Sequence, residues 1–404
     1  MVWGKRFAAG LTIWAGAFVA DTILNDDVDI VFTDRFRKRK SNLTPEERSQ
    51  LPKVVILGSG WGALSMIRKL HVDEFQVTVV SPRNYFLFTP LLASTTVGTL
   101  HQRSIVEPIR QFFNRSGAQL ADFLEAECTG IDFTKQIVTC KSPTKPEIKP
   151  FELEYDHLVI AVGCQSATFG IPGVQEHALF MKEINQSHVI RDKLLDCLET
   201  ASLPGLSSKE QQRLLTFVVV GGGPSGIEFS AELHDFLKRD VKRNYPALAD
   251  KVKVSLVEAL PHVLTMFDAS LIKKVEDQFR NELQIDLMLN CQVKAVDGKE
   301  LNILNEQKEM VKVPYGVLVW VTGNTPRPLI RDCMLALKDC QQDRRGLLVD
   351  GHFRVKGTNN CYAIGDCAIS KYPPTAQVAF QEVVELQESI YGSLGLAQVF
   401  LLWS

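Results

Sequence analysis

The stretch KVVILGSGWGALSMIRKL, from Lys53 to Leu70, decides how the first part of this chain folds. Its apolar run ends at Leu57 and is short and branched, as in a strand buried on both faces. Gly58 would permit a tight turn, Gly60 would let a pyrophosphate approach the backbone, and Ala63 would let the next helix press against the strand. The stretch predicts a phosphate-binding turn before a helix N-terminus. A buried strand and turn without a ligand is the alternative.

The second predicted strand departs from this motif in one respect. FQVTVVS, from Phe75 to Ser81, should end in an acid for the ribose hydroxyls, but it ends in Ser81. A serine hydroxyl could hydrogen-bond a ribose, with less discrimination than a carboxylate would provide.

The same pattern returns in FVVVGGGPSGIEFSAEL, from Phe217 to Leu233. Gly221, Gly223 and Gly226 take the three glycine positions, and the next strand, KVKVSLVE, ends in Glu258, where a ribose ligand is expected. Because the gap to Glu258 exceeds the usual spacing of about 20 residues, the intervening helix is predicted to extend through Asp250. Two such units predict two dinucleotides, and electron flow from a nicotinamide to a flavin explains both.

Two further segments support a flavin site. YDHLVIAVGCQSATFGIPG, from Tyr155, predicts a strand followed by a turn of small residues at Ala161 and Gly163. NCYAIGDCA places Gly365 and Asp366 after another strand. A carboxylate there suits a ribityl hydroxyl because it accepts two hydrogen bonds at close range; a helix N-cap is the other role open to Asp366.

Composition is that of an ordinary globular protein of two or three domains: 404 residues, 23% charged and 45% hydrophobic. The net charge of -2 gives no reason to expect a nucleic-acid partner. The nine cysteines form no CxxC pair, which favours incidental thiols in a reducing compartment. No metal-binding constellation is visible.

The N-terminal region, residues 1–50, reads as a leader and linker. An apolar run from Phe7 to Ala20 follows Lys5 and Arg6 and is short for a membrane span, which needs about 20 residues. The absence of acids before Asp21 favours an organelle-targeting or membrane-associating leader over a plain N-terminal helix.

Together these motifs resemble the type II (alternative, rotenone-insensitive) NADH:ubiquinone oxidoreductases of mitochondria and bacteria. The resemblance runs from about Lys53 to Glu382, and its most specific stretches are SPRNYFLFTPLL, from Ser81, and PPTAQVAFQE, from Pro373. It implies an α/β fold with two doubly wound Rossmann-like domains, the NADH domain being inserted in the FAD domain. The expected ranges are 51–168 and 331–404 for FAD and 169–330 for NADH.

The resemblance also implies roles for individual residues. Those expected around FAD are Gly58, Gly60, Ala63, Ser81, Arg83, Thr89, Pro90, Ala161, Gly163, Gly365 and Asp366. Those expected around NADH are Gly221, Gly223, Gly226 and Glu258, and Gly323 is expected to bind one of the two cofactors. Glu228 would stand close to the nicotinamide, and Gln377 and Gln381 would face the flavin on the quinone side.

Three of these residues also have simpler explanations. Gln377 and Gln381 are four apart and share one face of a helix that begins after Pro374, so they could be an ordinary solvated face. Glu228 could serve only the dipole of its helix.

The implied activity is a non-proton-pumping respiratory NADH dehydrogenase of the mitochondrial inner membrane, on a side that the sequence does not indicate. The family pattern ends soon after Gln381, so peripheral membrane contact is expected to be weakened by a short C-terminus, and homodimerisation stays open. One alternative is a flavoprotein that binds FAD and NADH for redox sensing or protein interaction. Another is a disulfide- or sulfide-type reductase, which needs paired cysteines; here Cys164 alone follows the flavin-side turn.

Overall fold

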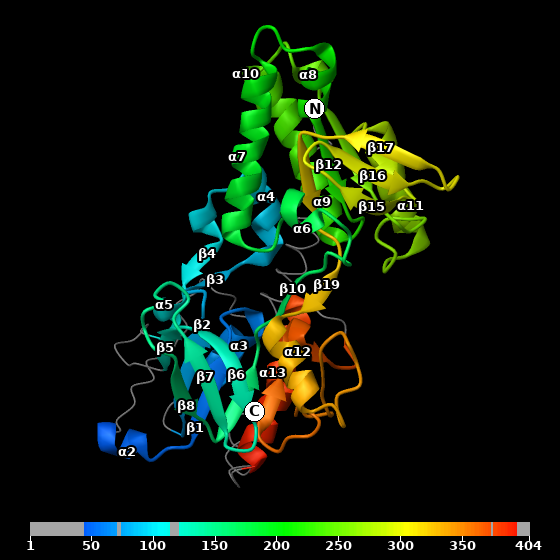
Figure 1. Cartoon of the computed structure of the whole chain (residues 1–404). Helices are drawn as coiled ribbons and strands as arrows, with labels where there is room; N and C mark the ends of the chain where they lie inside the picture. The colour runs from blue at the N-terminus through cyan, green and yellow to red at the C-terminus, as the bar shows by residue number, and fades with distance from the viewer. Residues whose placement is uncertain (1–43, 71–73, 114–120, 373–374, 394–404) are drawn as a thin grey trace. The chain divides into compact units, whose positions relative to one another are not determined.

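A computed structural model describes residues 44–70, 74–113, 121–372 and 375–393 of the chain (Figure 1). These residues form two compact units. The inserted unit contains Phe88–Ile105 and Ser166–Asn324, and the flanking unit contains the described residues among Thr33–Leu87, Val106–Gln165 and Thr325–Ser404. Each unit is described by itself below.

The flanking unit is built on a parallel sheet in which the chain reverses direction beside β1. The strand order is β21–β9–β1–β2–β5, and all neighbours are parallel. The chain moves from β1 outward through β2 to β5 and then returns to β9 on the other side of β1, so the topological switch point lies between β1 and β9. The strands are β1 (Lys53–Leu57), β2 (Gln76–Ser81), β5 (Asp122–Glu125), β9 (His157–Ile160) and β21 (Cys361–Ala363).

The inserted unit repeats this arrangement with the order β11–β18–β12–β13–β14, again parallel throughout. Here the switch point lies between β12 and β18. The strands are β11 (Leu179–Phe180), β12 (Thr216–Val220), β13 (Lys253–Val257), β14 (Asp286–Met288) and β18 (Val317–Trp320). The α/β fold with two doubly wound dinucleotide-binding domains is therefore confirmed.

Each unit returns to its switch point through an antiparallel three-stranded sheet. The sequence analysis did not predict these two sheets. Their strands are β6 (Glu127–Asp132), β7 (Ile137–Lys141) and β8 (Phe151–Glu154) in the flanking unit, and β15 (Gln292–Val296), β16 (Glu300–Leu304) and β17 (Met310–Pro314) in the inserted unit. Shorter strands are β3 (Tyr85–Leu87), β4 (Val106–Pro108), β10 (Cys164–Ser166), β19 (Asn324–Pro326), β20 (Leu347–Leu348) and β22 (Ala368–Ile369).

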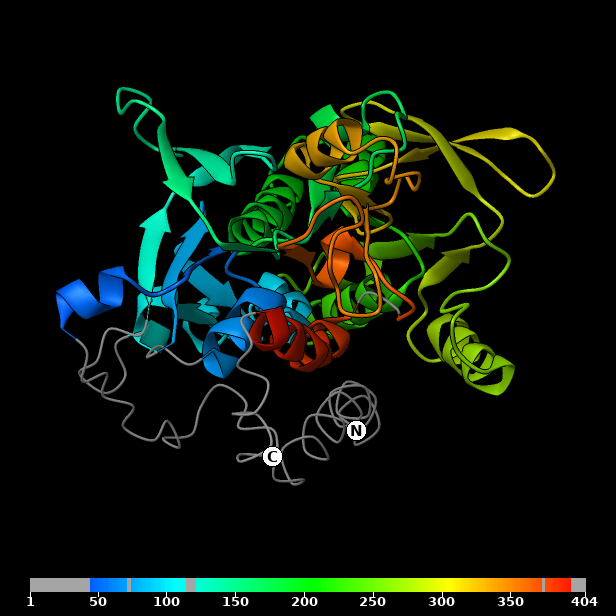
Figure 2. The same cartoon turned by 90° about the horizontal axis from the view of Figure 1, so that it is seen from below.

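Helices cover both sheets. In the flanking unit α13 packs along α3, as the adjacent red and blue helices of Figure 2 show. The helices of this unit are α2 (Pro45–Ser49), α3 (Trp61–Lys69), α5 (Ile109–Phe113), α12 (Pro328–Ala336) and α13 (Ala376–Ser393). Those of the inserted unit are α4 (Leu92–Val97), α6 (Val174–His177), α7 (Ile184–Ala201), α8 (Ser208–Leu214), α9 (Pro224–Phe236), α10 (Lys242–Asn244) and α11 (Ala269–Asn281).

The helix after the second glycine turn is shorter than expected. It continues from α9 through a π-helical turn, Leu237–Val241, and ends with α10 at Asn244 instead of reaching Asp250. Pro246 explains the difference, because the residue before a proline is disfavoured in the helical region. That residue, Tyr245, has φ -132° and ψ 59°.

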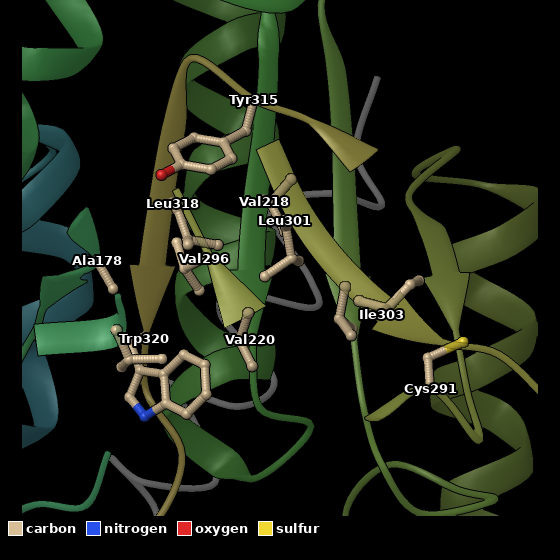
Figure 3. Close-up of a cluster of buried hydrophobic side chains, with 12 residues drawn as sticks. Ala178, Val218, Val220, Cys291, Val296, Leu301, Ile303, Tyr315, Leu318 and Trp320 are labelled. Carbon is tan, nitrogen blue, oxygen red and sulfur yellow. The ribbon is translucent and has the colours of Figure 1, made fainter. Parts of the chain in front are cut away.

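The core of the inserted unit joins its two sheets. Val218 and Val220 of β12 and Leu318 and Trp320 of β18 are at most 4% exposed and form one cluster with the antiparallel sheet (Figure 3). Trp320 is held at 1% exposure while its indole N–H donates to the carbonyl oxygen of Ala167 at 2.9 Å. This packing fixes the carboxyl end of β18, where the second switch point lies.

The units differ from the ranges expected from sequence by a few residues at two boundaries and by one whole segment. Phe88–Ile105 belongs to the inserted unit, although the sequence placed it in the first part of the FAD domain, because its helix α4 packs against α7 and α9.

The apolar stretch Phe7–Ala20 and the tail after Ser393 lie outside the described residues. Within the described ranges, no helix is both long and apolar enough to span a bilayer.

Candidate functional site

The two glycine turns have the same backbone geometry. Gly58, directly after β1, has φ +117°, and Gly221, directly after β12, has φ +121°. A side chain would be strained at either φ and would also collide: a Cβ on Gly58 would lie 2.3 Å from the carbonyl oxygen of Ala161, and one on Gly221 would lie 2.8 Å from the Thr322 side chain. Each glycine turn therefore lies directly against the residues that follow the neighbouring strand across the switch point, which is β9 for Gly58 and β18 for Gly221.

The helices after these turns begin without a side-chain cap. Gly60 precedes α3 and Gly223 precedes α9, and neither helix start receives a side-chain hydrogen bond from its N-cap. Space is open at Gly223, and at Gly60 the nearest group is the Arg83 guanidinium, 3.7 Å from where a Cβ would be. Both helix N-termini thus offer backbone N–H groups to an anion, with an arginine beside the first.

The third small residue of each motif permits close contact between helix and turn. Ala63 is completely buried. At the equivalent place in α9, a Cβ on Gly226 would lie only 1.8 Å from the carbonyl oxygen of Gly221. In the first motif the residue before Ala63, Gly62, also has no room for a side chain, because a Cβ on Gly62 would lie 2.9 Å from the Ile364 side chain.

Ser81 is 3% exposed, and its hydroxyl group is used inside the protein. It donates to Ser59 Oγ at 3.0 Å and accepts from the Arg83 N–H at 3.1 Å. Ser59, which the sequence analysis did not single out, in turn donates to the Arg83 carbonyl oxygen at 2.9 Å. In this structure Ser81 shapes the turn that presents Arg83, and its contact with a ribose stays a prediction.

Glu258 lies at the carboxyl end of β13, beside the second glycine turn. Its Oε2 accepts from the Gly222 N–H at 2.5 Å and its Oε1 from the Leu260 N–H at 2.9 Å. The carboxylate is half-buried and held in one orientation by these two bonds. Each carboxylate oxygen has a further lone pair, so the group can still accept a hydrogen bond from a ribose hydroxyl.

The flavin-side turns meet at the carboxyl edge of the flanking sheet. Ala161 and Gly163 follow β9, and Gly365 and Asp366 follow β21. The thiol of Cys164 donates to Asp366 Oδ2 at 3.0 Å, which joins the two turns. Asp366 lies within a 3₁₀ turn, Gly365–Cys367, so its expected role as the N-cap of the following helix is wrong: α13 begins only at Ala376.

Glu382 is a buried carboxylate behind this turn and was not predicted as a site residue. Its Oε2 accepts from the Gly365 N–H at 2.7 Å, and its Oε1 accepts from Ser370 Oγ at 3.1 Å. Burial raises the pKa of Glu382, while these two hydrogen bonds act in the opposite direction. Its position within PPTAQVAFQE was the available signal, but the contact itself could not be read from sequence.

Phe169 is a second residue that the sequence analysis missed. Its backbone has φ +53°, its side chain is 63% exposed, and its ring centroid is 6.5 Å from that of Trp320. The ring lies over Gly323, where a Cβ would be 2.3 Å from Phe169 Cζ. Phe169 is thus an exposed aromatic residue with a left-handed backbone conformation, and it lies beside Gly323, which follows β18. This combination is typical of functional sites.

Glu228 lies in the second turn of α9 and is half-buried. Burial, together with the negative charge of Glu232, raises the pKa of Glu228 to about 7. Glu232 is held by Ser94 Oγ at 2.7 Å and by Thr99 Oγ1 at 3.0 Å. Glu228, with Glu232 beside it, is therefore a carboxyl group with a pKa of about 7 on α9, the helix that follows the second glycine turn.

The remaining predicted residues are divided between the units. Thr89 and Pro90 are exposed in a 3₁₀ turn, Thr89–Leu91, of the inserted unit. Gln377 and Gln381 lie on α13 of the flanking unit, the first half-buried and the second exposed. Their roles toward a flavin or a quinone stay predictions.

A surface pocket of about 380 Å³ lies at the amino end of β18, the edge opposite to Gly323. It is lined by Glu176, His177, Leu179, Val189, Asp192, Lys193, Asp196, Gly298, Tyr315, Gly316, Val317 and Leu318. Because dinucleotides bind at the carboxyl ends of such strands, this pocket is not the candidate site.

Similarity to known proteins covers both sheets. The sequence pattern of the pyridine nucleotide-disulphide oxidoreductases matches residues 52–382. The mitochondrial external alternative NADH-ubiquinone oxidoreductase of Yarrowia lipolytica is 47% identical over 81% of this chain and 57% of its own length. The mitochondrial external NADH-ubiquinone oxidoreductase 2 of Saccharomyces cerevisiae is 44% identical over 86% of this chain and 64% of its own. The chain thus spans less than two thirds of these relatives.

Among solved structures, NDH2 from Plasmodium falciparum in complex with NADH is similar to this chain with a TM-score of 0.79. The two are 30% identical, and the similarity covers 85% of this chain and 83% of that one.

Proposed function

We propose that this chain, which belongs to the alternative NADH-ubiquinone oxidoreductases within the pyridine nucleotide-disulphide oxidoreductase family, is an FAD-dependent enzyme that passes electrons from NADH to a quinone. One observation carries the proposal beyond family membership. Both sheets have a glycine turn at their switch point; Asp366 lies on the turn after β21 at the same edge of one sheet, and Glu258 accepts from the Gly222 N–H in the other. Two sites of this kind suit two different dinucleotides.

In the flanking unit, the residues suit FAD. The N–H groups at the start of α3 and the Arg83 guanidinium would hold the pyrophosphate, while Asp366 would accept from the ribityl chain. FAD, when bound, supplies a ring that accepts a hydride and releases two electrons. The protein's part is to hold that ring in line with the two substrates and to shield it from water.

In the inserted unit, the residues suit NADH. The start of α9 would hold the pyrophosphate, and Glu258 would accept from the adenosine ribose. Glu258 lies on the β13 side of the glycine turn, and Gly323 and Phe169 lie on the β18 side. A dinucleotide that crosses the turn from Glu258 would therefore carry its nicotinamide toward Gly323, with Glu228 on the intervening helix.

The quinone and the location belong to the same proposal. Relatives named as mitochondrial ubiquinone oxidoreductases support a mitochondrial location and a quinone substrate. Gln377 and Gln381 are the side chains that we expect near the quinone, because amides can donate to its carbonyl oxygens without a change of charge. Peripheral contact with the inner membrane and a homodimer are parts of the proposal that flotation with liposomes and light scattering would test.

The central experiment is turnover of the purified chain. We expect bound flavin, rapid loss of its oxidised absorbance on anaerobic addition of NADH, and recovery of that absorbance when a short-chain ubiquinone is added. A chain that binds both dinucleotides but transfers no electrons to the quinone would favour a redox-sensing or interaction protein instead. Reduction of a disulfide instead of the quinone, or reduction of the flavin by sulfide instead of NADH, would support the reductase alternative.

A further inference from the structure

Two cysteines face each other across the antiparallel sheet of the flanking unit. Cys128 of β6 and Cys140 of β7 are register partners, and both side chains point into the protein, with 9% and 0% exposure. Helix α12 packs over β6 and brings Cys333, which is 3% exposed, near the pair. The flavin-side chemistry discussed above uses none of these thiols.

The spacing of the pair suits a disulfide. Directly opposed residues of antiparallel strands have Cα atoms about 4.5 or 5.5 Å apart, depending on the type of pair. Disulfides bridge Cα separations of about 4.4–6.8 Å, so both types of pair lie within that range.

The two thiols already interact. The neighbouring Cys140 thiol and burial both raise the pKa of Cys128. Cys128 is the more accessible residue of the two, with 9% of its surface exposed, whereas Cys140 is wholly covered.

We propose that Cys128 and Cys140 form a reversible intramolecular disulfide when the chain meets hydrogen peroxide. The peroxide oxidises the Cys128 thiol to a sulfenic acid and releases one water. The Cys140 sulfur then attacks the sulfenic sulfur, the S–S bond forms, and a second water leaves. The dithiol loses two electrons and two hydrogens, and the peroxide is reduced to two waters.

The disulfide would link β6 covalently to β7 beneath α12. A cross-link between residues of one strand pair restricts the unfolded chain, so the oxidised form should resist denaturation better than the reduced form. Because both sulfurs are shielded, the reaction should be slower than oxidation of Cys340, which is the exposed cysteine. The site would thus respond to sustained exposure to peroxide.

The test uses the full chain with Cys340→Ser, so that the exposed thiol does not react. After peroxide treatment, thiols are alkylated in denaturant and counted, and the peptides are identified by mass spectrometry. We expect two fewer thiols, one peptide pair that joins Cys128 to Cys140 with the loss of two hydrogens, and full recovery with dithiothreitol. The urea midpoint of the oxidised chain should rise and return on reduction.

Matched variants separate this pair from its neighbour. Cys128→Ser and Cys140→Ser should each abolish the linked peptide, whereas Cys333→Ser should leave it intact. An unchanged thiol count in the Cys340→Ser chain would overturn the proposal without relying on the fold of any variant in the pair. A peptide that joins Cys333 to Cys128, or a link between two chains, would overturn it as well.

Discussion

The Glu382 side chain holds the backbone of Gly365, whose N–H donates to Glu382 Oε2 at 2.7 Å. The two residues are 17 positions apart, and the contact fixes the turn that carries Asp366. Helix α13 thereby supports the turn that carries a candidate flavin ligand.

The first prediction concerns that contact. Glu382→Ala should leave the Gly365 N–H without its partner, which costs about 1–3 kcal/mol, and should loosen the Asp366 turn. We expect a lower flavin content in the purified chain and a lower melting temperature. Glu385→Ala, on the same helix, is the matched control and should keep the flavin. Equal flavin retention in the two variants would contradict a supporting role for Glu382.

The second prediction concerns the choice between NADH and NADPH. A carboxylate at Glu258 would accept from a 2'-hydroxyl but repel a 2'-phosphate, so we expect at least about tenfold preference for NADH in kcat/KM. Glu258→Gln should narrow this preference, because an amide does not repel the phosphate. Glu282→Gln, an exposed change in the same unit, should not alter it. Equal efficiency of the parent chain with both nucleotides would refute the assignment.

The third prediction concerns Phe169. If its exposed ring stacks on the nicotinamide end of NADH, then Phe169→Ala should raise the KM for NADH about two- to tenfold, the range expected for one aromatic pair. Phe169→Tyr keeps the ring and should stay close to the parent. Leu203→Ala removes another exposed apolar side chain of the same unit and serves as the surface control. A KM that is unchanged in Phe169→Ala would remove the ring from the binding site.

The fourth prediction concerns pH. The pKa of Glu228 is raised from its ordinary value of 4.5 to about 7, so the folded chain favours the neutral acid. The folded chain is therefore relatively more stable at low pH. The contribution of Glu228 to the free energy of unfolding, at most about 3 kcal/mol, is present below pH 4.5 and is lost as pH rises through 7. Glu228→Gln should remove this part of the pH dependence. Urea unfolding of both chains between pH 5 and pH 8 measures it, and parallel curves would show that Glu228 does not titrate there.

The fifth prediction concerns the quinone side. Gln377→Ala and Gln381→Ala should slow reoxidation of the flavin by quinone more than its reduction by NADH, because an amide has no charge to offer a hydride donor. Stopped-flow absorbance separates the two half-reactions. Val384→Ala, also on α13 and 40% exposed, is the control for the helix itself. Equal slowing of both half-reactions would indicate that the glutamines support the fold or the nicotinamide.

The glycine turns could be predicted because their requirements are local. One stretch of about a dozen residues contains the whole motif: a buried strand, a residue able to adopt φ near +120° and the start of a helix. The strand before Glu258 could be recognised for the same reason. Pro246 is also a local signal, and it explains why the helix ends at Asn244 rather than at Asp250.

The antiparallel sheets and several contacts at the site were not predictable in this way. Cys164 and Asp366 are 202 positions apart, and nothing in either segment alone indicates that their side chains meet. The Ser81 hydroxyl contacts Ser59 and the Arg83 N–H through the packing of β1 and β2, which neither segment alone indicates, and its expected contact with a ribose stays a prediction. Such contacts depend on strand order and register.

The sequence by itself determined that the chain has two glycine turns, one with an acid on the next strand at Glu258 and one without. It also placed Gly365 and Asp366 after a strand and two glutamines on one helix face, because strand and helix periodicity are properties of short segments. Only the tertiary structure decided that Glu382 supports Gly365, that Phe169 covers Gly323 and that Cys128 opposes Cys140. The Cys128–Cys140 pair is set by the antiparallel register of β6 and β7. The other two contacts depend on how α13 and the Phe169 loop pack, so all three arise from packing of a whole unit rather than from any single stretch.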